Sequence, residues 1–122
     1  MTTVPRAGTV SGMEHWDLRT LDVQPHQPKI LHSSRGESRT IILHLPAGEA
    51  LQDHEVHERA HFVVIDGEVE VEAAGGSFSG GAGFMAIWDP QERHEVRATS
   101  DARILLVLAP WPGEGHPGAR DA

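Results

Sequence analysis

Four histidines are the residues of this chain whose type and spacing could do chemistry. His54, His57 and His61 fall within eight residues of one another, and His94 follows further along the chain. Neutral imidazole is the commonest protein ligand for metals, so these side chains are candidate metal ligands. An all-imidazole set would suit Zn, Ni, Cu or Fe better than Mg or Ca. For His54 and His94 the alternatives are a polar pair in a binding pocket or a vestigial site filled by water. For the other two they are surface or dimer-interface histidines.

The first three histidines precede a segment that is typical of a β-hairpin. An apolar run at 62–65 is followed by Asp66-Gly67 and by a strictly alternating stretch at 68–72. Asp-Gly between two such runs is a strong hairpin signal, because both central residues of the favoured turn take positive φ. The strand period of two predicts that His61 faces away from the interior if Phe62 faces inward. His57 is expected in a loop, where it could turn inward.

The other patterned segments are also short strands separated by Gly, Pro and Ser turns. No segment shows a helical period longer than two turns, and this spacing of strands and turns predicts an all-β sandwich or barrel. The glutamates that alternate at 68–72 are expected on a solvated face. The aromatic residues Phe62, Phe84 and Trp88 are expected in the core. The predicted strands lie at residues 15–20, 28–32, 39–45, 77–79, 84–88, 94–99 and 103–108.

Composition excludes several classes of function. The chain has 122 residues and a formal net charge of −8, whereas nucleic acids and anionic membranes require a basic surface. It contains no cysteine, which excludes thiolate metal sites and is compatible with the cytoplasm expected here. No apolar run approaches the roughly 18 residues of a membrane helix, and the first residues lack the apolar stretch of a secretory signal.

In the order of its strands and turns the chain resembles the cupins, which are small jelly-roll barrels. Their first motif is Gly, five residues, His-x-His, three or four residues, Glu, six residues and Gly. Gly48, His54 and Gly67 fall in register with it. Their second motif, a Gly, then Pro-x-Gly, then His and Asn, is similar to the segment that contains Gly83, Pro90 and His94.

The chain also departs from these motifs. Val56 and Ala60 stand where the resemblance implies the second histidine and the glutamate, and Glu92 replaces the second-motif glycine. The asparagine falls at Ala98 or a neighbour. Only His54 and His94 therefore carry over, and the usual iron or manganese site of three histidines and one glutamate is not complete. His57 and His61 could compensate, and Glu55 or Glu58 could add a carboxylate only if the loop folds back.

The expected protein is a single all-β, jelly-roll cupin barrel over residues 13–109, with a disordered lead at 1–12 and a Pro/Gly-rich tail at 110–122. It is expected to form a homodimer through edge strands or sheet faces. One functional hypothesis is a small-molecule-binding protein with a metal site (Zn, Ni, Fe, Cu or Mn). If it is an enzyme, the resemblance implies dioxygenase-like or isomerase-like chemistry. The other hypothesis is a metal-free, non-catalytic binding, sensing or dimerisation module.

Overall fold

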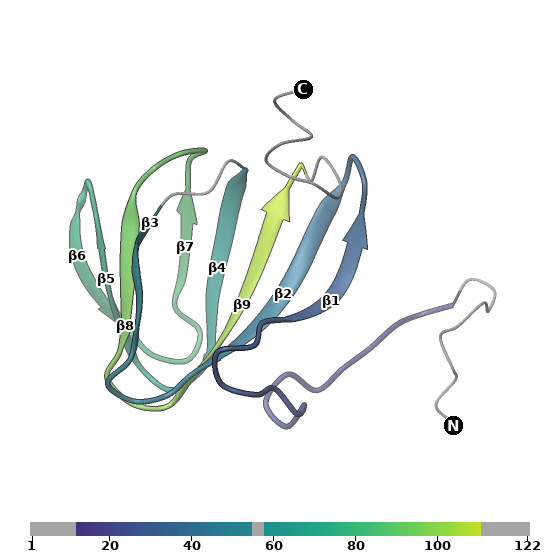
Figure 1. Cartoon of the computed structure of the whole chain (residues 1–122), viewed down its shortest axis with the longest axis horizontal. Helices are drawn as coiled ribbons and strands as arrows, with labels where there is room; N and C mark the ends of the chain where they lie inside the picture. Colours follow the sequence, from purple (N-terminus) through teal and green to yellow (C-terminus); the bar gives the residue numbers. More distant parts are fainter. Residues whose placement is uncertain (1–11, 55–57, 111–122) are drawn as a thin grey trace.

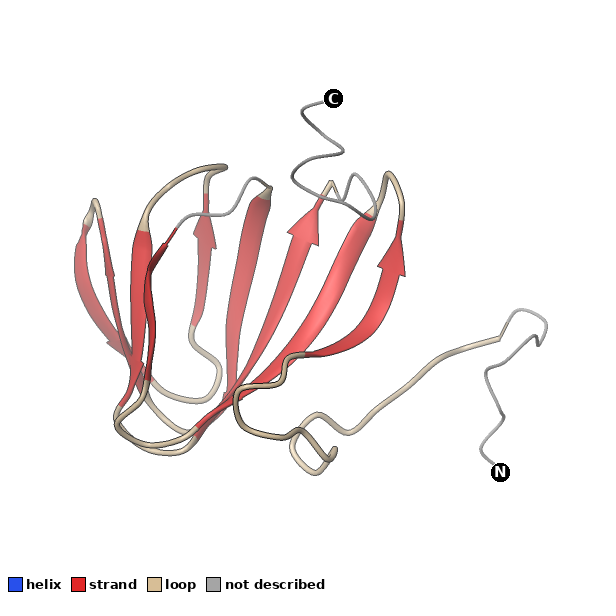
Figure 2. Ribbon diagram, viewed as in Figure 1, coloured by secondary structure: helices blue, strands red, loops and turns tan. Residues whose placement is uncertain are grey.

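The computed structural model describes residues 12–54 and 58–110, which form nine strands and no helix (Figures 1 and 2). Because the patterned segments alternate apolar and polar residues, each strand can bury one face and leave the other toward solvent. The strands are β1 Lys29–Ser34, β2 Ser38–Leu45, β3 Ala50–His54, β4 Arg59–Asp66, β5 Val69–Ala73, β6 Gly76–Gly80, β7 Met85–Trp88, β8 His94–Ala98 and β9 Ala102–Ala109.

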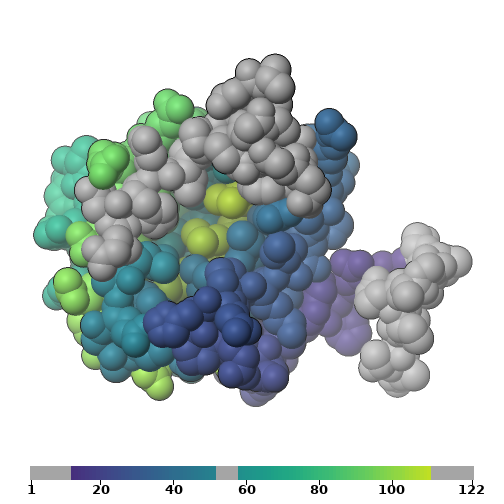
Figure 3. Space-filling model, viewed as in Figure 1, coloured from purple at the N-terminus to yellow at the C-terminus, as the bar shows by residue number. Residues whose placement is uncertain are grey.

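The strands form two antiparallel sheets that face each other. One has five strands in the order β1-β2-β9-β4-β7, and the other has four in the order β3-β8-β5-β6. Figure 1 shows the two sheets curving around a shared interior. The segment before β1 packs along the lower edge of the barrel in the space-filling view (Figure 3). The all-β jelly-roll prediction is confirmed.

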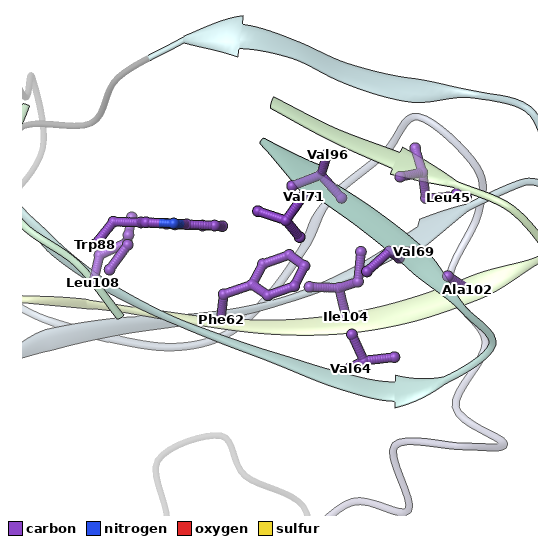
Figure 4. Packing of buried hydrophobic residues seen from close by; sticks show 12 residues of the cluster. Leu45, Phe62, Val64, Val69, Val71, Trp88, Val96, Ala102, Ile104 and Leu108 are labelled. Atoms are coloured by element: carbon purple, nitrogen blue, oxygen red, sulfur yellow. The ribbon is translucent and has the colours of Figure 1, made fainter. Parts of the chain in front are cut away.

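A single apolar cluster fills the space between the sheets. On β4 the residues Ala60, Phe62 and Val64 are buried and alternate with less buried neighbours. Figure 4 shows Trp88 and Leu108 at one end of this cluster, with Phe62 beside them. The predicted core positions of Phe62 and Trp88 are confirmed, and Phe84 is partly buried and packs against the cluster.

The predicted hairpin at Asp66-Gly67 is wrong. β4 pairs with β7 and β9, whereas β5 pairs with β6 and β8, so the turn carries the chain from one sheet to the other. Gly67 takes φ +83°, but Asp66 is not among the positive-φ residues that a hairpin turn of this kind requires. The turn instead bonds to the β8–β9 connection, where Thr99 N donates to Glu68 O at 2.9 Å.

The N-terminal strand predicted at 15–20 is also wrong. Leu21 N donates to Asp17 O at 3.0 Å, which closes a turn in that segment. The Arg103 guanidinium donates to the carbonyls of Leu18 and Leu21 and holds the turn against the barrel. Tertiary contacts have therefore overridden a weak local strand preference.

Residues 12–54 and 58–110 contain no helix that could cross a membrane. The expectations for the lead, apart from residue 12, and for the tail beyond residue 110 lie outside the described residues, as does the expectation for His57.

Candidate functional site

His94 is the best-defined polar side chain of the interior. It begins β8 and is only 4% exposed. Its ring stacks on the Trp88 indole with a centroid separation of 3.7 Å and an interplanar angle of 8°. Its Nδ1 lies 3.1 Å from Glu92 O. Because a carbonyl oxygen can only accept, we assign the hydrogen to Nδ1, and in the neutral ring Nε2 then carries the lone pair. Nε2 is thus the atom of His94 suited to bind a metal or a ligand proton.

The loop between β7 and β8 places the Glu92 carbonyl under His94. Asp89 N donates to the Glu92 carboxylate at 3.0 Å, and Glu92 N donates to Asp89 O at 3.0 Å. Gln91, between them, takes φ +68°. Glu92, which replaces the motif glycine, therefore closes the loop through its own side chain. The residue with left-handed backbone geometry is Gln91, one position before Glu92. This arrangement fixes the orientation of the imidazole as outer-sphere partners of metal ligands do.

Trp88 joins this site to the core. Its ring lies 4.9 Å from that of Phe62, at an interplanar angle of 51°, and it also stacks on the ring of His94. The indole is buried, so one wall of the site is a rigid aromatic surface. Sequence analysis placed Trp88 in the core, but nothing in the spacing of residues indicated that it would stack on His94.

The backbone register brings His54 to His94. The two residues are Cα partners across the antiparallel pair of β3 and β8, after an irregularity between Leu51 and His54. Residues that lie opposite each other in such a pair share one face of the sheet. The side chain of His54 lies outside what the structure describes, so the convergence of these two positions is established for the backbone alone.

His61 lies on the other face of β4 from the inward-facing Phe62, as strand parity predicts. Its register partners are Ile87 on β7 and Val107 on β9. The structure therefore does not bring His61 to His94.

Glu58 is an interior carboxylate. From the sequence, it was expected to reach the site only if the loop folded back. It immediately precedes β4 and is 3% exposed. It stands two positions before Ala60 and so has the parity of the inward-facing residues of β4. That parity was the signal that could have identified it.

These residues gather at one end of the barrel. The end of β3, the start of β4, the end of β7 and the start of β8 all lie at the upper rim in Figure 1. An ion pair between Arg59 and Asp89 ties two of these segments together on the exposed side. A shallow, open hollow of about 490 Å³ lies beside this rim. It is lined by Glu72, Ala73, Ala74, Glu92, Arg93, His94 and Glu95.

The described side chains do not by themselves complete a metal centre. No three His, Asp or Glu side chains within the described part of the chain lie close enough together to hold an ion. A complete centre would need His54 or a residue of the 55–57 segment in addition to His94.

Comparisons with known proteins give the same architecture. The cupin domain model matches residues 41–109. An RmlC-like cupin from Desulfovibrio desulfuricans superposes with a TM-score of 0.70 at 22% identity, over 82% of this chain and 98% of that one. An RmlC-like cupin from Methanocaldococcus jannaschii gives 0.69 at 16% identity, over 86% and 95%.

A Streptococcus pyogenes protein of unknown function gives a TM-score of 0.65 at 18% identity, over 81% of this chain and 89% of that one. At these identities the structural matches show the fold and not the activity. A search among curated proteins finds no match. With more than half of its length matched by the family model, the chain belongs to the cupin family.

Proposed function

We propose that this cupin binds a transition metal, a small molecule or both at the barrel rim, through a pocket built on His94 and His54 with His57 assisting. The observation that carries the proposal is the pairing of His54 with His94 across β3 and β8. Two imidazole-bearing residues at paired positions, one of them buried and oriented, form the minimal basis of a metal or ligand site.

The orientation of His94 supports this proposal further. Its Nδ1 bonds to the Glu92 carbonyl and its ring is clamped against Trp88, so Nε2 has a fixed direction. The residue as a whole is 4% exposed, which limits its contact with water. A histidine that served only to fill the core would not need both the hydrogen bond at Nδ1 and the stacking on Trp88.

Glu58 is the described carboxylate that we propose as a further ligand of this pocket. It is buried and has the inward parity of Ala60, the position at which the cupin glutamate is missing. A set of two histidines and one carboxylate is one that redox-active iron can use. A bound metal would supply Lewis-acid or oxygen-activating chemistry, and this chain would contribute the orientation of its imidazoles and the dry aromatic wall at Trp88.

A second candidate function is a metal-free, non-catalytic module that binds or senses a small molecule. The observation that favours it is that Val56 and Ala60 stand at two positions where the cupin motif has metal ligands. In this version His94 Nε2 accepts a hydrogen bond from the ligand, and Trp88 provides a stacking surface.

Metal content separates the two candidates. Tag-free protein is loaded in turn with Zn, Ni, Cu, Fe and Mn, desalted and analysed by plasma mass spectrometry. The variants are His54→Ala and His94→Ala, and His61→Ala serves as the matched control because His61 faces away from the interior. About one equivalent in the wild type and the control, lost in both other variants, would establish the metal site. No retained metal in any sample would leave only the metal-free candidate.

Tryptophan fluorescence tests the small-molecule part of the proposal. Because Trp88 stacks on His94 at 3.7 Å, a ligand at this rim should change its emission. Replacement of Trp16 and Trp111 by Phe leaves Trp88 as the sole indole. The pocket is supported if a library ligand changes the emission of this single-tryptophan protein and has no such effect once His94→Ala is added. A ligand that acts equally on both binds elsewhere.

A further inference from the structure

The strand β6 is an open edge of the four-stranded sheet. Within residues 12–54 and 58–110 it pairs with β5 alone, because the order of this sheet is β3-β8-β5-β6. Figure 1 shows β6 as the outermost strand on its side of the barrel. The free side of an edge strand presents N–H and C=O groups that can bond to a further strand. β6 can therefore accept an added strand.

β6 lacks the features that protect the other sheet edges of the described chain. Edge strands are commonly blunted by bulges, charged residues, proline or short length. β1 and β3 each carry a register irregularity against their neighbouring strands, and β7 has only four residues. β6 pairs with β5 over five consecutive positions without a shift, and its sequence, GSFSG, contains no charged residue and no proline. Among these edges, β6 is the one most suited to pairing.

The outward side of the sheet next to this edge is acidic. Glu70 and Glu72 on β5 are exposed, and their register partners on β6 are Ser79 and Ser77. The Glu72 carboxylate accepts a bond from Ser77 Oγ at 3.4 Å, so it lies toward β6. Four charged side chains line an open hollow of about 230 Å³ on this side: Glu70, Glu72, Glu95 and Arg97. Three carboxylates against one guanidinium favour a cationic partner.

The two glutamates of β5 have the spacing of alternate side chains on an added strand. Residues two positions apart on a strand are separated by about 7 Å, and the same repeat applies to a strand placed beside β6. The intervening side chains, Ser77 and Ser79, are small. Long, flexible basic side chains on the added strand can therefore extend over the serines to Glu72 and Glu70.

The inner side of the same edge is apolar. Phe78 is the register partner of Val71, which is 3% exposed, so Phe78 stands on the side of β6 that faces the core. Phe78 is nevertheless 55% exposed, and no strand of the described chain lies beyond it. An apolar side chain on an added strand, opposite Phe78, would cover part of this ring.

We propose that β6 binds an extended peptide segment of a partner protein in which basic and apolar residues alternate. The segment adds a strand to the four-stranded sheet, and its main-chain bonds to β6 provide affinity. Its basic side chains lie over Ser77 and Ser79 and pair with Glu72 and Glu70, while its apolar side chains cover Phe78. A second copy of β6 does not meet this requirement, because GSFSG offers no basic side chain.

Fluorescence anisotropy of a labelled peptide, titrated with the full chain, tests the proposal. The probe has three lysines that alternate with two valines, between terminal threonines. It should bind with a dissociation constant on the order of 100 μM, since ordering a short segment offsets much of the attraction. A peptide with glutamates in place of the lysines should bind at least about 10-fold more weakly, because like charges then face each other.

Two N-methylated probes separate strand addition from simple charge attraction. One carries methyl groups on its lysine amides, and the other carries them on its valine amides. Because alternate amides of a strand point to opposite edges, one form should lose at least about 10-fold in affinity and the other should keep it. Equal binding of the two forms would overturn the proposal.

A single charge-neutral variant tests the acidic row. Glu72→Gln should weaken binding of the lysine probe about 3-fold, as expected for the loss of one exposed ion pair. Glu37→Gln is the matched control, because Glu37 is equally exposed to solvent in class but lies between β1 and β2 on the other sheet. It should leave the dissociation constant unchanged, and an equal loss in both variants would contradict the assigned surface.

Amide hydrogen exchange locates the contact. Saturating lysine probe should slow exchange at residues 76–80 of β6 and leave the β1 edge, residues 29–34, unchanged. Absence of binding up to millimolar concentration, or protection of another edge in place of β6, would overturn the proposal. Protection of β6 that grows with protein concentration without peptide would also overturn it, because the occupant would then be a second copy of the chain.

Discussion

Replacement of Gly67 by alanine tests the turn that carries the chain between the sheets. Gly67 takes φ +83°, and a Cβ added there would lie 2.0 Å from Asp101 O and 2.7 Å from Ala102 Cα. Both are backbone atoms, so no flexible side chain can move aside. The backbone at 101–102 is itself held, because Ala102 is buried and paired with Leu45 in β9 and β2.

Gly48→Ala is the comparison variant that separates backbone strain from steric strain in the expected loss of unfolding free energy. It takes φ +87°, but an added Cβ would meet nothing within 4 Å. Gly48→Ala should therefore lose only the left-handed backbone preference, about 1–2 kcal/mol. Gly67→Ala should lose that amount and a further ~1–3 kcal/mol of steric strain. The difference between the two variants isolates the close approach of Gly67 to the β8–β9 connection.

Equilibrium unfolding in urea measures both losses, and a slope equal to that of the wild type validates the comparison. In thermal unfolding, each kcal/mol should lower Tm by about 4 °C for a domain of this size. Equal losses in Gly67→Ala and Gly48→Ala would refute the argument, because the glycine would then serve backbone conformation alone. A loss of unfolding free energy that is smaller for Gly67→Ala than for Gly48→Ala would contradict the close approach of Gly67 to the backbone of residues 101–102.

Three further changes have expected outcomes. Phe62→Ala should lower the unfolding free energy by about 3–5 kcal/mol in urea titration, because it empties the fully buried site beside Trp88. Arg103→Ala should cost ~1–3 kcal/mol by leaving two carbonyls without their donor, and should speed limited proteolysis within residues 12–28. Gln91→Gly should raise Tm slightly, with a gain of ~0.5–1 kcal/mol, because φ +68° strains a residue with a Cβ. Unchanged proteolysis, or a lowered Tm for the last variant, would contradict these assignments.

Strand faces were predictable because burial follows a period of two. The pattern at 60–64 identifies Ala60, Phe62 and Val64 as inward, and all three are buried. The same argument places His61 outward. These predictions needed only local alternation, which each strand carries in its own residues.

Strand pairing was less predictable because it depends on segments far apart in the chain. Asp66-Gly67 has the composition of a hairpin turn, but β4 gains β7 and β9 as partners instead of β5. The local signal specifies a tight reversal and a glycine. It does not specify whether the strand on the far side stays in the same sheet, since that depends on which long-range pairings bury more apolar surface.

The contacts that hold the His94 ring were also unpredictable, but for a different reason. The spacing of Pro90 and His94 identified the histidine, but its partners are a backbone carbonyl and an indole ring. A carbonyl is present at every residue, so no residue type signals that it will accept a bond. The loop conformation that aims the Glu92 carbonyl is held by hydrogen bonds within the loop, from Asp89 N to the Glu92 carboxylate and from Glu92 N to Asp89 O.

The loss of the motif glutamate and the position of Trp88 have a common physical basis. Ala60 is the register partner of both Trp88 and Leu108, so its side chain faces the interior between two large neighbours. Cβ atoms of such partners lie about 5 Å apart, and a methyl group there lets the indole reach Phe62 on one side and His94 on the other. A glutamate at that position would compete with this stack for the same space. In this chain, therefore, we expect the aromatic stack that orients His94 to take the space that a glutamate at position 60 would need. Glu58, two positions earlier and of the same strand parity, is buried.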